Sequence, residues 1–333
     1  MKVLYILANA PQDCESYIEA EIKYALKRDV QVEIWTSFKG YGQPPVAPLN
    51  YGSVHDTIGR FKPDVIHIHY LVTAQQTFRD LSTSIPVTVR AHSFDWDPVR
   101  ALAVASHPAV RAVYAFPHFA REVPPDRKIV PMPVAYDYSL YNLPSEPKDR
   151  RLVLRLASGR RVKGLRDFLE IGNRVPEARF VLGVTPIRGD EAYLNELQRE
   201  NGKLGGRVEV RTGGIVGGLS RADVVALTAK AGIYLETNDP NGHRLGMQIS
   251  IAEAMATGAY VLARWAPTLE EYVGDGAAPY RSVDEAVAMV RQTFDWTDAQ
   301  WDAQGNRAVV RSTPFRSDVV LGRLVDDWAR FAK

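Results

Sequence analysis

The sequence contains a single cysteine, Cys14, so it cannot form a disulfide within the chain. It has no run approaching the roughly 18 apolar residues that a membrane-spanning helix needs, and any membrane contact would therefore be peripheral. Its net charge is only +2, and it lacks the aromatic and basic interleaving typical of proteins that bind single-stranded nucleic acid. These absences favour a cytoplasmic protein whose partner is not a nucleic acid.

Length and composition indicate two domains. The chain has 333 residues, of which 46% are hydrophobic. A single hydrophobic core rarely serves more than about 250–300 residues, so we expect two cores, each serving about 150 residues.

Strand-like and helix-like segments alternate in both halves of the chain. Short apolar runs predict strands at residues 2–7, 31–35, 64–69, 86–90, 110–114, 128–131, 152–156, 179–182, 208–211, 232–236 and 260–263. Amphipathic spacing predicts helices at residues 15–27, 54–61, 73–82, 98–105, 165–173, 191–201, 221–229 and 315–331. Such alternation is typical of α/β folds with parallel sheets, in which the loops after the strands line a ligand crevice.

The two halves are separated by residues 143–150, which are rich in proline and charge, as linkers are. We therefore predict an N-terminal Rossmann-like domain over residues 1–146 and a second one over residues 147–314. The amphipathic segment 315–333 is predicted as a separate C-terminal helix.

Residues 237–258 follow the predicted strand 232–236 with a turn and then a helix. The first N–H groups of a helix have no partner within it, which makes this a suitable place for an anion or a sugar hydroxyl. Helical spacing leaves Glu253 on a flank of the buried face. The alternative is an ordinary βαβ unit with a surface glutamate.

A basic turn follows the predicted strand 152–156. Arg160 and Lys163 stand between Gly159 and Gly164, just before the next helix. Glycines permit close approach, arginine binds phosphate bidentately and lysine acts as a point charge, so this pattern favours a diphosphate site. A solvated run of cations is the alternative.

Histidines follow two predicted strands of the first half. His67 and His69 share one strand face, which suits either a metal site or hydrogen bonding, and with no third ligand nearby in the sequence we favour hydrogen bonding. His92 lies in the loop after strand 86–90, where a neutral imidazole can bind a sugar hydroxyl or relay a proton. A structural role is the alternative for His92.

Several of these segments resemble one enzyme family. Residues 253–263, EAMATGAYVLA, resemble the EAMACGxPVVA signature of retaining glycosyltransferases of family 4, which have the two-domain GT-B fold. Residues 158–164 resemble GRLvpeKG, residues 89–95 resemble tvHGxD, and residues 10–22 resemble the FPxxSETFIxxEI opening of exopolysaccharide and lipopolysaccharide members. Residues 130–141 resemble vIPNGVDxxxF, which closes the first domain in that family.

The resemblance implies roles for particular residues. His92, Arg160 and Lys163 would act at the reaction centre, with the two cations on the donor diphosphate and His92 beside the reacting sugar. Further donor contacts would come from Gly159, Asn238, His243, Gly246, Met247, Gln248 and Glu253. Glu15, Ser16 and Asp95 would lie on the acceptor side, with Asp95 either binding acceptor or shaping its loop. The last helix would cross back to the first domain, as in other GT-B proteins.

The implied activity is metal-independent transfer of a sugar, with retention, from a nucleoside-diphosphate donor to a hydroxyl of a glycan, glycolipid or other acceptor. No cofactor is implied beyond the donor itself. The sequence departs from the family at Leu245, where a second glutamate is usual. This departure keeps open a nucleotide-sugar-binding protein that has lost turnover. A GT-B sugar-nucleotide epimerase and a nucleic-acid-modifying transferase are a further alternative.

Overall fold

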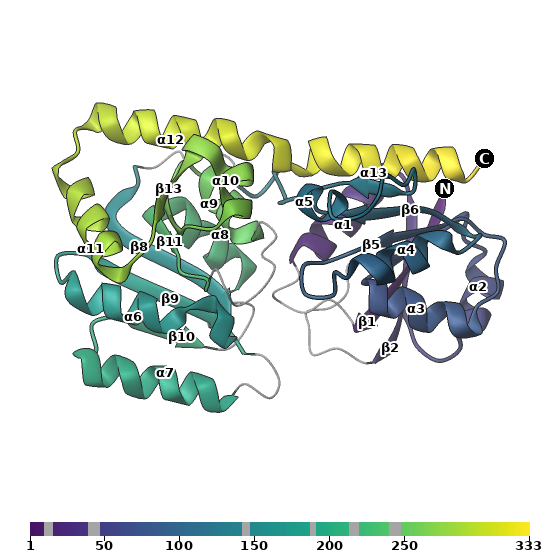
Figure 1. The fold of residues 1–333 in the computed structure, drawn as a ribbon, viewed down its shortest axis with the longest axis horizontal. Coiled ribbons are helices and arrows are strands. Elements are labelled where there is room, and N and C mark those ends of the chain that lie inside the picture. Colours follow the sequence, from purple (N-terminus) through teal and green to yellow (C-terminus); the bar gives the residue numbers. More distant parts are fainter. Residues whose placement is uncertain (10–15, 39–46, 142–146, 187–190, 213–219, 240–247) are drawn as a thin grey trace. The chain divides into compact units, whose positions relative to one another are not determined.

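The computed structural model describes residues 1–9, 16–38, 47–141, 147–186, 191–212, 220–239 and 248–333. These residues form two compact units, each with its own parallel sheet (Figure 1). Unit 1 contains Met1–Tyr136 together with Phe315–Lys333, and unit 2 contains Asp137–Pro314. Residues 143–146 of the predicted linker 143–150 lie outside the described residues, and residues 149 and 150 begin the first strand of unit 2. None of the described helices is both long and apolar enough to cross a membrane.

Unit 1 is built on a seven-stranded sheet in the order β3-β2-β1-β4-β5-β6-β7, with every neighbouring pair parallel. The strands are β1 (Lys2–Asn9), β2 (Gln31–Phe38), β3 (Leu49–Asn50), β4 (Val65–His69), β5 (Val87–Arg90), β6 (Val110–Ala115) and β7 (Ile129–Pro131). All five residues of β4 are buried, as expected of a central strand covered on both faces.

The helices of unit 1 are α1 (Ser16–Lys27), α2 (Val54–Phe61), α3 (Leu71–Asp80), α4 (Pro98–Ser106), α5 (Pro117–Ala120) and α13 (Ser317–Phe331). Helix α13 comes from the far end of the chain, and its apolar stripe, including Leu321, Leu324 and Trp328, is part of the core that contains Tyr5 of β1 and Ile22 of α1. The expectation of a last helix that returns to the first domain is therefore confirmed.

Unit 2 has a six-stranded parallel sheet in the order β10-β9-β8-β11-β12-β13. Its strands are β8 (Asp149–Ser158), β9 (Arg179–Thr185), β10 (Glu209–Thr212), β11 (Ala231–Glu236), β12 (Tyr260–Arg264) and β13 (Ala277–Tyr280). Its α-helices are α6 (Leu165–Arg174), α7 (Glu191–Leu204), α8 (Arg221–Lys230), α9 (Ile249–Ala256), α10 (Pro267–Val273), α11 (Val283–Gln292) and α12 (Asp298–Ser312). Short 3-10 turns occur at η1 (Arg161–Lys163), η2 (Gly274–Gly276), η3 (Thr293–Asp295) and η4 (Thr313–Phe315).

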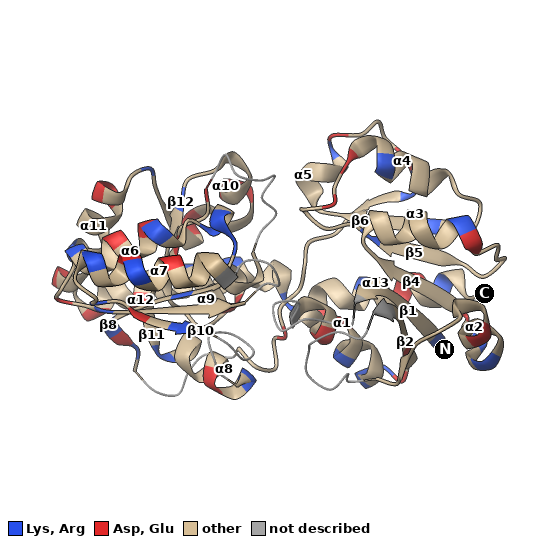
Figure 2. Cartoon of the chain, turned by 90° about the horizontal axis from the view of Figure 1, so that it is seen from below, with Lys and Arg blue, Asp and Glu red and all other residues tan. Residues whose placement is uncertain are grey.

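Positions of basic and acidic residues lie close together along the ribbons of α6 and α7 in unit 2 (Figure 2). Arg166 of α6, for example, pairs with Glu196 and Glu200 of α7. Residues paired in this way form ion pairs on the surface of the unit. Residues that could bind a ligand are instead expected where the parallel strands end.

Candidate functional site

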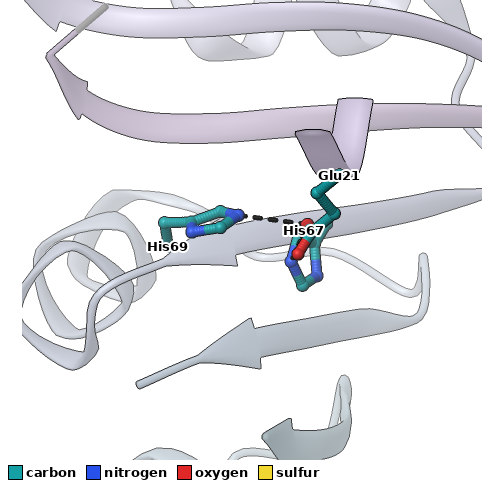
Figure 3. Close-up of side chains that lie close together, drawn as sticks. All are labelled: Glu21, His67 and His69. Atoms are coloured by element: carbon teal, nitrogen blue, oxygen red, sulfur yellow. Dashed lines mark hydrogen bonds and ion pairs between the residues drawn. The ribbon is translucent and has the colours of Figure 1, made fainter. Parts of the chain in front are cut away.

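A buried polar cluster lies at the centre of unit 1, around the carboxylate of Glu21. His67 and His69 are two residues apart on β4, so both rings point to the same side of the sheet, toward α1 (Figure 3). Nε2 of His69 is hydrogen bonded to Oε1 of Glu21 at 3.2 Å. Nε2 of His67 lies 3.1 Å from the same oxygen but lacks hydrogen-bond geometry with any described residue.

The second ring nitrogen of each histidine, Nδ1, also has a partner. Nδ1 of His69 lies 3.0 Å from Nε2 of His92, and Nδ1 of His67 lies 2.8 Å from the hydroxyl of Thr88. Thr88 in turn accepts a hydrogen bond of 3.1 Å from the indole of Trp328 on α13. The returning helix thus supports the histidine cluster directly.

The charges in this cluster are nearly balanced. Burial acts to raise the pKa of Glu21, but the surrounding histidines hold it well below its usual range. Burial lowers the pKa of His67 to about 4 and that of His92 well below its usual value. Near pH 7 an ionised Glu21 therefore lies 3.9 Å from the guanidinium of Arg90, with His67 and His92 neutral.

Glu21, His67 and His69 form the one group of possible metal ligands found among the described residues. Their ligand atoms lie within 4.8 Å of one another, and zinc accepts such a donor set. Glu21 is the third ligand that sequence reasoning did not find. However, a divalent ion here would face the Arg90 guanidinium in a dry interior, where like charges repel strongly, whereas Arg90 already balances Glu21. The contacts favour a hydrogen-bonded array, as the sequence analysis expected.

The loop that carries His92 is held by Asp95. One oxygen of Asp95 accepts from the backbone N–H of His92 at 2.9 Å, and the other accepts from Leu71 and Val72 at the start of α3. Both carboxylate oxygens are therefore used within unit 1, which matches the loop-shaping role. Burial raises the pKa of Asp95, and the backbone hydrogen bonds oppose that shift.

Aromatic rings surround His92, which is 4% exposed. Its ring centroid lies 4.5 Å from that of Tyr70 and 5.0 Å from that of Tyr17, and it stacks on His69 at 5.2 Å. Tyr17 and Glu21 are one turn apart on α1, so one face of this helix contacts both His92 and His69.

In unit 2, the basic turn lies between β8 and α6 and is anchored to the end of β11. The hydroxyl of Thr237 donates to the carbonyl of Lys163 at 3.0 Å, and the N–H of Asp239 donates to the carbonyl of Val162 at 3.0 Å. Gly164 has a φ of +58°, and a Cβ there would lie 1.8 Å from the carbonyl oxygen of Thr237. Only glycine fits this position.

The cations of this turn differ in their contacts. Arg161 forms an ion pair of 2.7 Å with Glu196 of α7, and Arg166 pairs with the same carboxylate. Arg160 and Lys163, the two predicted phosphate ligands, are both half-buried and flank Arg161. The predicted Gly159 is buried, and a Cβ there would lie 2.8 Å from the side chain of Leu194.

A second buried polar cluster surrounds Arg155 at the ends of β8 and β11. Its Nη2 donates to Glu236 at 2.7 Å and to the side-chain oxygen of Asn238 at 2.9 Å, and its Nη1 donates to Tyr234 at 2.9 Å. Asn238, a predicted donor contact, is thus fixed by Arg155. Its Nδ2 and Oε2 of Glu236 are buried without hydrogen-bond partners among the described residues.

Glu253 lies on α9 and is buried. Burial raises its pKa to about 7, and the nearby Arg221 and Tyr141 offset only part of that shift. Gln248 is the N-cap residue of the same helix. Glu253 is therefore not the ordinary surface glutamate that was the alternative.

Other predicted residues lie outside the described part of the chain. They are Glu15, His243, Leu245, Gly246 and Met247, and the side chain of Ser16 is likewise not described. The structure adds residues that the sequence analysis did not assign to a site, namely Tyr17, Glu21, Tyr70, Arg155 and Glu236. For Glu21 a signal existed, because it is the next-to-last residue of the segment 10–22 that resembles the family opening.

Two Rossmann-like units, with the last helix returning to the first, define the GT-B fold. Solved structures agree over nearly the whole chain. The Anabaena protein HepE in complex with UDP-glucose has a TM-score of 0.75 at 17% identity and covers 99% of this chain and 100% of that one. Sucrose-phosphate synthase from Thermosynechococcus elongatus has a TM-score of 0.72 at 13% identity, covering 99% of each chain.

A glycosyltransferase from Rickettsia africae is similar to the same degree, with a TM-score of 0.72 at 13% identity over 99% of this chain and 98% of that one. The structural neighbours are thus GT-B glycosyltransferases, and identities this low establish the fold alone. No protein-family model and no curated protein matches the sequence. Membership in family 4 stays a prediction.

Proposed function

We propose that the protein is a retaining glycosyltransferase, which moves a sugar from a nucleoside-diphosphate donor to a hydroxyl of a glycan, a lipid-linked glycan or a similar acceptor. The observation that carries this proposal is the basic turn of unit 2. It presents Arg160 and Lys163 at a strand-to-helix junction, locked by the close approach of Gly164 to Thr237. A junction of this kind suits a diphosphate.

The donor would be held by residues of unit 2. Arg160 and Lys163 would bind the diphosphate and stabilise the charge that develops on it as the sugar leaves, the electrostatic mode of catalysis. Glu253 would accept hydrogen bonds from the ribose hydroxyls. Gly159, Asn238 and Gln248 would complete the described part of the donor site, with no metal ion or cofactor required.

The acceptor hydroxyl would be met by unit 1. His92 would contact this hydroxyl, because its ring is held by Tyr17, Tyr70 and His69 at the end of β5. Asp95 would keep the His92 loop in place, and Glu15 and Ser16 would contribute from the start of α1. A cytoplasmic enzyme that meets membrane-bound acceptors from one side would fit this scheme.

The phosphate contact can be tested by calorimetric titration with UDP, GDP and ADP. Lys163→Ala should weaken binding of the preferred nucleoside diphosphate by about tenfold to a hundredfold, because a charge-assisted hydrogen bond contributes about 1.5–3 kcal/mol. Arg166→Ala is the matched control, since Arg166 already pairs with Glu196 and Glu200. Equal affinities in the wild type and the Lys163 variant would remove the turn from the site.

Leu245 in place of the usual glutamate favours one competing function, a nucleotide-sugar-binding protein without turnover. Incubation with a panel of nucleotide sugars, with and without hydroxyl acceptors, separates the two. Release of nucleoside diphosphate supports the transferase. Tight binding of a donor without release, unchanged in Leu245→Glu, supports the binding protein.

A further inference from the structure

The buried array of unit 1 links a carboxylate to His92 through a second histidine. Glu21 is ionised and can only accept hydrogen bonds, so His69 must donate to it from Nε2. The other nitrogen of His69, Nδ1, lies 3.0 Å from Nε2 of His92. One of these two nitrogens must carry the proton that they share.

Charge balance decides where that proton lies at rest. Arg90 and Glu21 already cancel, with 3.9 Å between guanidinium and carboxylate, so a positive ring on His69 would leave an uncompensated buried charge. A neutral His69 that donates from Nε2 has a bare Nδ1, which must accept from Nε2 of His92. His92 is neutral as well, so its single proton is on Nε2 and its Nδ1 carries a lone pair.

We propose that Glu21, His69 and His92 form a proton relay in which Glu21, acting through His69, keeps Nδ1 of His92 unprotonated and able to take the proton of a bound hydroxyl. His92 is the catalytic residue of the relay, and Glu21 and His69 are positioning residues. The role in transfer rests on the proposed function, whereas the arrangement of protons does not.

Sugar transfer moves two protons along the relay. The acceptor hydroxyl gives its proton to Nδ1 of His92 and uses the freed electron pair to bond to the anomeric carbon of the sugar. Nε2 of His92 passes its proton to Nδ1 of His69, and the bond from sugar to diphosphate breaks with its electron pair on the diphosphate. His92 stays neutral, and the new imidazolium of His69 faces the Glu21 carboxylate, which stabilises it. The relay resets when the Nδ1 proton of His69 returns to Nε2 of His92 and the Nδ1 proton of His92 is released to solvent.

Other groups around Glu21 fit this scheme. The Tyr5 hydroxyl is buried, and the neighbouring Glu21 carboxylate adds to the effect of burial in raising its pKa, so Tyr5 stays a neutral partner. Nη2 of Arg90 donates to the carbonyl of Pro133, which fixes the guanidinium beside the carboxylate. The array thus has one anion, one cation and three histidines, of which His69 and His92 share a mobile proton.

The arrangement of protons can be read directly by nuclear magnetic resonance on protein labelled with nitrogen-15 in histidine. In the wild type, Nε2 of His92 should show the shift of a protonated ring nitrogen and Nδ1 that of a bare one, with the signals assigned by their loss in His92→Gln. A protonated Nδ1 would overturn the relay. This reading needs no substrate, so it stands even if the protein transfers no sugar.

Two variants separate position from proton transfer. His69→Asn places an amide oxygen near the former Nδ1, so the tautomer of His92 should persist, yet no proton can pass, and turnover should fall about a hundredfold or more at unchanged donor affinity. Glu21→Gln removes the anion that stabilises the His69 imidazolium and should lower turnover to a similar extent. Wild-type turnover in a folded His69→Asn would overturn the relay.

His67→Asn is the matched control. His67 is as buried as His69 and contacts the same oxygen of Glu21, but it leads to Thr88 and not to His92. Its loss should lower the melting temperature and leave the tautomer of His92 unchanged. Metal analysis of the purified protein completes the test, because one bound zinc per chain on Nε2 of His69 would replace the relay with a metal site.

Discussion

At the scale of single residues, burial changes the acid–base behaviour of Glu253. Its pKa of about 7 means that the buried side chain changes charge near neutral pH. A carboxylate accepts two hydrogen bonds from a ribose diol more strongly than a carboxylic acid does. Binding of a nucleotide and ionisation of Glu253 are therefore linked in the proposed site.

We expect nucleotide affinity to rise as the pH increases through about 7. The folding stability should move in the opposite direction. A folded pKa raised above the unfolded value contributes stability that is complete below about pH 4.5 and is lost as the pH rises to about 7.

Calorimetry and urea unfolding at pH 5 and pH 8 measure the two effects. Glu253→Gln is the control, because it should flatten the contribution of this group to both profiles. Identical pH dependence of binding in the wild type and Glu253→Gln would show that Glu253 does not bind the ribose.

The residues predicted from sequence were those that stand in a recognisable local pattern. His92, Glu253 and the basic turn each follow a strand and precede or occupy a helix, so their neighbourhood could be inferred from a few adjacent residues. Glu21 could not be paired with His69 in this way. Their contact depends on the packing of α1 over β4, which brings together residues that are 48 apart in the chain.

At the scale of elements, the turn from β8 to α6 depends on Gly164. Gly164→Ala should lower the free energy of unfolding by about 1–2 kcal/mol for the left-handed backbone alone, and the clash with Thr237 adds to this cost. The displaced turn should also lose affinity for nucleoside diphosphate. Chemical denaturation and calorimetry on the same preparation measure both losses.

Gly202→Ala in α7 is the control for a glycine in the same unit. A Cβ at Gly202 meets nothing within 4 Å, and alanine favours a helix interior by about 1 kcal/mol, so this variant should be slightly more stable than the wild type. Wild-type stability and affinity in Gly164→Ala would mean that the turn tolerates a side chain, contrary to its geometry.

Alternation of apolar runs was enough to predict the strands of both sheets except β3 and β13, with shifts of a few residues at their ends. No helix or strand is predicted from the sequence within residues 264–314, although α11 and α12 carry local start signals. Ser282 caps α11, and Thr297 with Gln300 forms a capping box at α12. Those helices could have been predicted, whereas the two-residue β3 has no signal of its own and is defined by pairing with β2.

At the scale of the whole molecule, unit 1 is discontinuous in sequence. Phe315–Lys333 belongs to the unit that Met1–Tyr136 begins, and the backbones of Tyr136 and Ser317 are joined by a hydrogen bond of 3.0 Å. Trp328 is fully buried in the core of unit 1 and donates to Thr88. Unit 1 therefore cannot complete its core without the end of the chain.

Deletion of residues 317–333 should abolish the cooperative unfolding of unit 1. Removing one large core side chain typically costs 2–5 kcal/mol, so losing Leu321, Leu324 and Trp328 together approaches the whole stability of a domain. Scanning calorimetry should show that the transition of unit 2 persists while that of unit 1 disappears.

Trp328→Phe is the milder companion to the deletion. It keeps an aromatic ring in the core but removes the hydrogen bond to Thr88, and it should lower the stability of unit 1 by about 1 kcal/mol plus the cost of the smaller ring. Two unchanged transitions in the truncated protein would show that α13 is dispensable for unit 1.

The discontinuity of unit 1 also sets an order of events on the ribosome. Domains usually fold from the N-terminus as the chain emerges. Here the first sheet to be made must wait for α13, whereas all of Asp137–Pro314 has been synthesised before α13 begins. We therefore expect unit 2 to be able to fold first and the histidine array of unit 1 to assemble only once α13 has been synthesised.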